Sequence, residues 1–151
     1  MSAGFHIREG MAAMDLATVR EWLANSYWTP GIAREVIERA AVNSALVLGA
    51  FAADGAQVGF MRVVSDKTRF AYLCDVIVDE AWRGRGVARA MVAHVLDHPE
   101  FATVRTWTLA TRDAHGVYAA LGFKPMDDPE SRPQTWMVLR RGPQWVEAAP
   151  S

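Results

Sequence analysis

The sequence predicts a single mixed α/β (α+β) domain, and three observations lead to that prediction. The chain has 151 residues, the length of one ordinary domain, and 51% of them are hydrophobic, which is enough for a complete core. Apolar residues follow a strand-like period in some segments and a helical period in others. In the second half, helical and strand-like segments alternate in the order of a βαβα unit. We expect one domain over residues 1–141 and a C-terminal tail over 142–151.

The N-terminal part is predicted to hold one strand and two helices. Residues 5–8 form a short strand-like segment. Apolar residues recur at helical spacing over 16–23, and Asp15 before them has a side chain suited to capping a helix. The breaker sequence TPG at 29–31 ends this pattern, and a second helical pattern follows over 32–40.

Three strands in a meander are predicted next. The segments 45–53 and 57–64 flank Asp54-Gly55, a dipeptide typical of hairpin turns. Asp66-Lys67 marks a second turn, after which the apolar segment 69–78 forms the third strand.

The second half supplies the remaining elements. A helical stripe covers 86–97, a β-branched and aromatic strand covers 104–110, and a short helix over 113–121 precedes Gly122 in the position of a C-cap. A final strand is predicted over 135–139. The expected architecture is a mixed central sheet of six to seven strands flanked by about four helices.

Charge and cysteine content exclude several classes of protein. The 16 Lys and Arg residues nearly balance the 17 Asp and Glu residues, so neither nucleic acid nor a membrane surface is an expected partner. No apolar run approaches the ~20 residues that span a bilayer, and the N-terminus lacks a signal pattern. The single cysteine, Cys74, cannot form an internal disulfide and fits a reducing compartment. We expect a soluble, cytoplasmic protein.

One segment concentrates glycine and arginine, the sequence RGRGVAR at 83–89, between the third strand and the next helix. A helix start presents unpaired N–H groups, and glycines let an anion approach them closely. Arg83, Arg85 and Arg89 can add charge-assisted hydrogen bonds. The segment is therefore either a phosphate site or a tight turn with a solvated basic rim. It lacks the Lys-Ser/Thr ending of a P-loop and the third glycine of the dinucleotide fingerprint.

The motifs of this region resemble those of the GNAT N-acetyltransferase superfamily. RGRGVA at 83–88 is similar to its Arg/Gln-x-x-Gly-x-Gly/Ala signature. DVIVDE at 75–80 resembles its fourth strand, and AHGVYAALGF at 114–123 resembles its Tyr-x-x-x-Gly-Phe segment. The resemblance extends from about Phe5 to Leu139. It implies the GNAT fold and direct transfer of acetyl from acetyl-CoA to an amine. The alternatives are a non-catalytic acyl-CoA-binding sensor of the same fold and, less favoured, a nucleotide-binding domain.

The resemblance also implies where acetyl-CoA would bind. The pyrophosphate would lie on the main chain of the glycine turn, and the pantetheine arm would pair with the fourth strand. Many family members carry an Asn that contacts CoA before the tyrosine helix, whereas this sequence has ATRD at 110–113, so either Thr111 or Asp113 takes its place or this contact is absent. The implied cofactor-binding residues are Val76, Ile77, Val78, Arg83, Gly84, Arg85, Gly86, Val87, Ala88, Arg89, Thr111 and Asp113.

Two residues are candidates for proton transfer. The resemblance implies that Tyr118 protonates the leaving thiolate, for which a phenol held against the sulfur is suited; otherwise its ring simply packs in the core. Asp75 lies in an apolar run, so its carboxylate is paired, open to a cleft, or raised in pKa. It is therefore either the general base or a paired structural aspartate.

The acceptor is predicted to be a small-molecule amine whose identity the sequence leaves open. The resemblance places the acceptor pocket at the loop between the first two helices, where Tyr27 and Trp28 could form an aromatic wall. A core position for these rings is the alternative. No metal is expected, because the four histidines lack ligand spacing. Dimers are common in the family, so the resemblance leaves a homodimer as one possible assembly.

Overall fold

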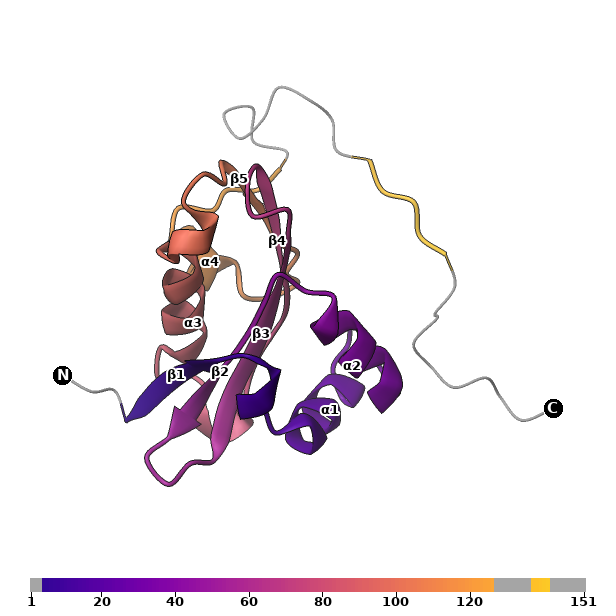
Figure 1. Ribbon diagram of the computed structural model, residues 1–151, viewed down its shortest axis with the longest axis vertical. Helices are drawn as coiled ribbons and strands as arrows, with labels where there is room; N and C mark the ends of the chain where they lie inside the picture. Colours follow the sequence, from indigo (N-terminus) through magenta and orange to yellow (C-terminus); the bar gives the residue numbers. More distant parts are fainter. Residues whose placement is uncertain (1–3, 127–136, 142–151) are drawn as a thin grey trace.

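The computed structural model describes residues 4–126 and 137–141, and its centre is one five-stranded sheet in the order β1-β2-β3-β4-β5 (Figure 1). Neighbours from β1 to β4 are antiparallel, whereas β5 is parallel to β4. The strands are β1 (Phe5–Glu9), β2 (Leu46–Ala52), β3 (Gln57–Ser65), β4 (Phe70–Val78) and β5 (Thr106–Thr108). The helices are α1 (Leu16–Ala24), α2 (Arg34–Val42), α3 (Val87–Leu96) and α4 (His115–Ala119), with 3₁₀ turns at Met11–Ala13, Glu80–Trp82 and Pro99–Phe101.

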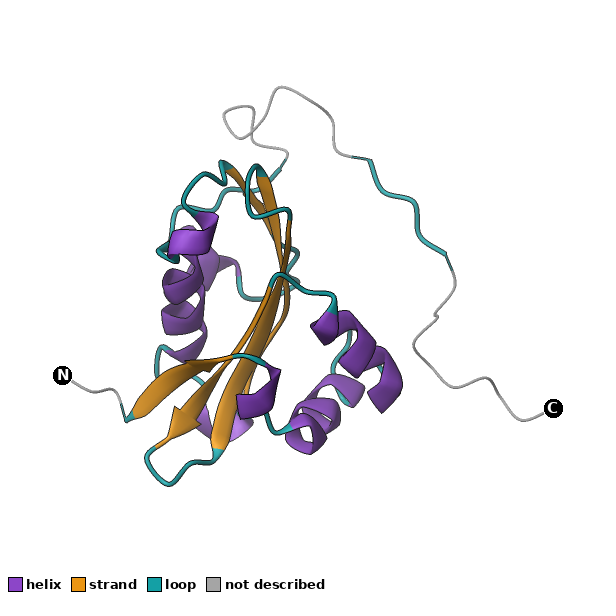
Figure 2. Ribbon diagram, in the orientation of Figure 1, coloured by secondary structure: helices purple, strands orange, loops and turns teal. Residues whose placement is uncertain are grey.

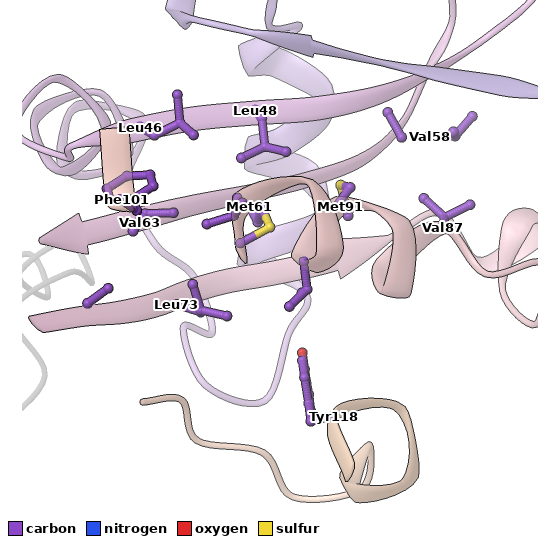
Figure 3. Packing of buried hydrophobic residues seen from close by; sticks show 14 of the residues in the cluster. Leu46, Leu48, Val58, Met61, Val63, Leu73, Val87, Met91, Phe101 and Tyr118 are labelled. Atoms are coloured by element: carbon purple, nitrogen blue, oxygen red, sulfur yellow. The ribbon is translucent and has the colours of Figure 1, made fainter. Parts of the chain in front are cut away.

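Helices cover both faces of the sheet, α3 and α4 on one side and α1 and α2 on the other (Figure 2). The α3 face holds the larger apolar cluster, in which Leu48, Met61 and Val63 of the sheet pack with Met91 of α3 (Figure 3). The opposite face buries Phe60 and Ile77 against α1 and α2. In the described part of the chain, no helix has the length and apolar character that a membrane span requires.

Local signals set the helix ends as predicted. The Asp15 side chain accepts a hydrogen bond from Thr18 N–H at 3.2 Å and so caps α1. Gly122 has φ 97°, and the N–H of Phe123 after it donates to the Tyr118 carbonyl at 3.1 Å. This bond closes α4 in the manner of a glycine C-cap.

A β-bulge interrupts β4 at Asp75. Phe60 pairs with Ile77 and Arg62 pairs with Cys74, so two residues of β4 lie opposite the single residue Met61 of β3. Asp75 has φ 55°, in the left-handed region that non-glycine residues rarely adopt and that aspartate tolerates better than most. The sequence analysis did not predict this bulge.

The last two predicted strands need correction. β5 spans Thr106–Thr108 rather than 104–110, because its main chain pairs with β4 only from Phe70 to Tyr72 and then diverges. Residues 137–139 form no strand: their side chains are 75–89% exposed and no neighbouring strand pairs with them. Thr135 and Trp136 lie outside the described residues. The sheet therefore has five strands in residues 4–126 and 137–141, against six to seven predicted.

Candidate active site

A cleft opens where β4 and β5 diverge. The two strands pair only over three residue positions, and beyond Tyr72 the main chain of β4 is no longer joined to β5. The cleft has a volume of about 1610 Å³. It is lined by the second half of β4, the turn between β4 and α3, the α1–α2 loop, and the segment from Leu109 to α4. Nearly every residue singled out by the sequence analysis faces this one space.

The glycine turn lies at one end of the cleft. Gly84 and Gly86 have φ 76° and 80°, and a Cβ added at either position would meet no atom within 4 Å. Gly86 is the N-cap of α3 and no side chain caps this helix, so the first N–H groups of α3 keep their capacity to donate. The turn therefore offers unobstructed donors and the positive end of a helix dipole, which fit a pyrophosphate.

The three arginines of the turn have different surroundings. Arg83 donates from Nε to the Val78 carbonyl at 3.3 Å and lines the cleft. Arg89 also lines the cleft, and its side chain makes no hydrogen bond or ion pair with any described residue. The Arg85 guanidinium instead lies 4.6 Å from the Trp82 ring centroid. Arg83 and Arg89 are therefore the side chains placed to contact an anion in the cleft.

Tyr118 lies on α4 with its ring directed toward the sheet (Figure 3). It is 8% exposed and lines the cleft, and its ring packs edge-on against Phe123. Its hydroxyl makes no hydrogen bond within residues 4–126 and 137–141. Burial, with smaller contributions from Tyr27 and Asp113, raises the pKa of Tyr118 to about 12. The phenol is therefore a fully protonated donor at the cleft wall.

Asp75 is a paired carboxylate. Its Oδ2 accepts from Arg62 Nε at 2.8 Å, and its Oδ1 accepts from Trp28 Nε1 at 3.0 Å. The ion pair is largely shielded, with side-chain exposures of 20% for Arg62 and 12% for Asp75. Burial opposes the charge of Arg62, but the Asp75 carboxylate more than compensates and raises the pKa of the guanidinium.

The two predicted acceptor-site aromatics lie side by side at the cleft. The rings of Tyr27 and Trp28 meet edge to face at 5.0 Å between centroids. One face of Tyr27 is already covered by the Arg112 guanidinium, at 3.8 Å from the ring centroid. The Tyr27 hydroxyl also accepts from the Arg112 main-chain N–H at 3.0 Å. Tyr27 therefore joins the α1–α2 loop to the segment before α4.

The remaining candidate residues are Thr111, Asp113 and Cys74. Thr111 accepts from the Ala114 N–H at 3.0 Å through Oγ1, and both Thr111 and Asp113 line the cleft. Burial raises the pKa of the Cys74 thiol to about 11, so this thiol is protonated and a poor nucleophile at neutral pH. Among the described residues, no group of three His, Cys, Asp or Glu is arranged to hold a metal ion.

Comparison with known proteins places this cleft in a family. The family model described as "Acetyltransferase (GNAT) domain" matches residues 47–125, just over half of the chain. The chain belongs to the GNAT acetyltransferase family. A crystal structure of a protein from Xanthomonas campestris pv. campestris, classed as a GNAT-family acetyltransferase, is 37% identical with a TM-score of 0.77, over 88% of this chain and 93% of that one.

More distant structures share the fold of this GNAT domain. An acetyltransferase structure from Deinococcus radiodurans R1 is 20% identical with a TM-score of 0.72, covering 99% of this chain and 98% of that one. Glucosamine-6-phosphate N-acetyltransferase from Arabidopsis thaliana is 16% identical with a TM-score of 0.65, covering 91% and 98%. Comparison with curated protein sequences gave no match.

Two residues of this GNAT cleft and one backbone feature were not predicted from the sequence. Arg62 could have been found, because a charged side chain between Met61 and Val63 in an apolar strand needs a partner. Arg112 carries no such signal, since it lies in a polar loop. The bulge at Asp75 also leaves no trace in the alternation of residue types.

Proposed function

We propose that the chain is an acetyl-CoA-dependent N-acetyltransferase that acts on a small-molecule amine. The observation that carries the proposal is the shared cleft, which is lined by both the open glycine turn at the start of α3 and the phenol of Tyr118. The glycine turn suits a pyrophosphate, and the phenol suits a leaving thiolate. In acetyl-CoA the pyrophosphate and the sulfur lie at opposite ends of the pantetheine arm.

The cofactor would be held mainly by main chain. The N–H groups from Arg85 to Ala88 would donate to the pyrophosphate, with Arg83 and Arg89 neutralising its charge. Val76 to Val78 would offer main-chain groups to the pantetheine arm, because β5 no longer pairs with this part of β4. Thr111 and Asp113 would contact the cofactor from the opposite wall.

The chemistry asked of the chain is one proton transfer and the placement of two substrates. Acetyl-CoA supplies an acetyl group activated as a thioester, whose C–S bond breaks as the amine nitrogen bonds to the carbonyl carbon. Tyr118 would give its phenolic proton to the departing sulfur and regain a proton from solvent, and the attacking nitrogen, which is cationic in the tetrahedral adduct, would lose one proton to solvent or to a base. The acceptor would enter beside Tyr27 and Trp28, which line the same cleft.

The test is release of free thiol from acetyl-CoA in the presence of a panel of amines that includes amino acids, polyamines, amino sugars and a lysine peptide. We expect thiol release that depends on one acceptor class, with acetylated product found by mass spectrometry. Tight binding of acetyl-CoA by calorimetry, without thiol release for any acceptor, would contradict the enzymatic role and favour an acyl-CoA sensor.

A further inference from the structure

The bulge of β4 lines the cleft, and its backbone is held in an uncommon conformation. Asp75 is one of two non-glycine residues with positive φ in the described chain, the other being Lys67 in a surface turn. A left-handed residue inside a strand needs support from its surroundings, because it opposes the local preference of the chain.

Side chains from two other elements supply that support. Arg62 reaches Asp75 from the neighbouring strand β3, and Trp28 reaches it from the α1–α2 loop. Arg62 also donates from Nη1 to Ser44 Oγ at 3.4 Å, and Ser44 donates to the Ala40 carbonyl in α2 at 2.7 Å. The carboxylate at the bulge is thus tied to the sheet and to the helical layer at the same time.

The bulge has a direct consequence for the main chain of β4. In an antiparallel pair, alternate residues bond to the neighbouring strand and the residues between them direct their N–H groups to the other side. An extra residue shifts this alternation and leaves a main-chain group outside the ladder. Since β5 stops pairing at Tyr72, the groups directed away from β3 around the bulge face the cleft.

We infer that Asp75 is a positioning residue that, together with Arg62 and Trp28, fixes the β4 bulge so that its main-chain N–H groups face the thioester carbonyl. The inference rests on the proposed transfer from acetyl-CoA, and it assigns Asp75 a role other than general base. Both carboxylate oxygens already accept a hydrogen bond from a donor that cannot take up a proton in exchange. The carboxylate therefore acts through the backbone it holds.

A positioning role and a general-base role for Asp75 predict different results for three substitutions at this residue. Asn tolerates positive φ and can still accept a hydrogen bond from Trp28. Gly adopts positive φ but has no side chain to accept one. Ala neither favours positive φ nor accepts a hydrogen bond. A positioning role predicts a graded loss of kcat: about 10-fold or less for Asp75→Asn, more for Asp75→Gly, and roughly 10²-fold for Asp75→Ala, the size reported for misplaced reacting groups. The pH profile of kcat/KM for Asp75→Asn should keep the wild-type shape.

Two further variants separate positioning from stability. Trp28→Phe removes one donor to Asp75 and leaves a smaller aromatic ring in its place, so we expect a lower kcat with a folded protein. Val95→Ala, in the α3 face of the core, serves as the matched control, because it lowers the melting temperature without touching the cleft. Its kcat should remain within twofold of wild type.

Equal loss of activity in the three Asp75 variants, with one ionisation missing from the pH profile, would overturn the inference in favour of a general base. Unchanged kcat in Asp75→Gly and Trp28→Phe would overturn it as well. If the wild-type protein transfers no acetyl group, the proposed function is wrong, but the positioning role of Asp75 can still be tested by calorimetry. In that case Asp75→Gly should bind acetyl-CoA at least threefold more weakly, and unchanged affinity would refute the positioning role.

Discussion

At Tyr118, burial affects both partners of the proposed proton transfer. The pKa of the phenol rises to about 12, which by itself makes it a weaker acid than free tyrosine. The thiol of Cys74, which lines the same cleft, has its pKa raised to about 11 for the same reason. A thiolate leaving in this environment is therefore also a stronger base. Burial therefore weakens the acid and strengthens the base of the proposed transfer, and the two effects act in opposite directions.

The substitution Tyr118→Phe tests the phenol directly. It removes the hydroxyl and keeps the ring that packs against Phe123, so the fold should be preserved. We expect kcat to fall roughly 10²-fold, the usual contribution of general acid catalysis, with the affinity for acetyl-CoA nearly unchanged. Steady-state kinetics and calorimetry with the substrate pair from the thiol-release screen measure the two quantities.

One observation would contradict this role for Tyr118: an unaltered kcat in the variant under conditions where a pre-steady-state burst is absent, so that chemistry limits the rate. A decline of wild-type kcat between pH 8 and 10 that Tyr118→Phe abolishes would instead keep the role and contradict the raised pKa, because a phenol with a pKa of about 12 stays protonated in that range.

Residue types could be selected from the sequence, but their partners could not. An acid within an apolar run and a tyrosine on a short helix both stand out against their neighbours. Asp75 has two partners, Arg62 at 13 positions and Trp28 at 47 positions along the chain. Arg112 lies 85 positions from its partner Tyr27. Such pairings depend on how the sheet and the α1–α2 loop come together, which local sequence does not encode.

At the scale of elements, the start of α3 combines three properties that no single residue has. Gly86 supplies the left-handed turn, the absent side-chain cap leaves the first N–H groups available, and the open space above Gly84 and Gly86 admits a ligand. A phosphate bound there would accept hydrogen bonds from the first N–H groups of α3. In α1 the side chain of Asp15 accepts such a bond instead.

Substituting Gly86→Val should therefore weaken binding of acetyl-CoA. The side chain would occupy the space above the turn and disfavour its positive φ, costing one charge-assisted hydrogen bond. We expect the dissociation constant from calorimetry to rise about 10- to 100-fold, since such bonds contribute about 1.5–3 kcal/mol each.

Gly55→Val is the matched control for this prediction. Gly55 lies in the β2–β3 hairpin with φ 91°, and a Cβ there also meets no atom within 4 Å. Both variants suffer the same kind of backbone strain, so their melting temperatures should fall by similar amounts. Equal affinity for acetyl-CoA in the two variants would show that the glycine turn does not hold the cofactor.

Elements with their own end signals were predictable, and elements that depend on a neighbour were not. The caps at Asp15 and Gly122 and the turns at Asp54-Gly55 and Asp66-Lys67 appear where the sequence placed them. The segment 104–110 has strand-forming composition throughout, yet only the three residues that reach β4 form a strand. Composition fixes the preference for extended structure, whereas pairing decides its length.

At the scale of the whole molecule, the cleft results from a change in strand direction. The antiparallel meander from β1 to β4 is closely paired, and the crossover through α3 returns the chain as a parallel neighbour with only three paired positions. The site is then built from parts that lie far apart in the chain, among them the α1–α2 loop, β4, the start of α3 and α4. The element order could be predicted, and with it the place of the site. The divergence of β4 and β5 was implied by the family resemblance, whereas the residue types of the two strands do not show where it begins.

The protonation of this shared cleft also governs stability at high pH. The pKa of Cys74 rises from 9.0 to about 11, and that of Tyr118 rises from 10.0 to about 12. Between these values the folded chain keeps protons that the unfolded chain has released, so the free energy of unfolding falls as pH rises. The stabilisation by each group is complete below its unfolded pKa and is lost as the pH passes through its folded pKa. Two pKa units correspond to about 2.7 kcal/mol for each group at full loss.

Urea denaturation at pH 7, 9, 10 and 11 measures this effect across the whole molecule. By pH 11 the wild-type chain has passed most of the Cys74 range and half of the Tyr118 range, so we expect its free energy of unfolding to drop by roughly 3–4 kcal/mol. Cys74→Ala should flatten the curve mainly between pH 9 and 11, whereas Tyr118→Phe should flatten it only above pH 10. Parallel curves for all three proteins would mean that neither group is desolvated in the folded state, and the cleft wall would then be open to water.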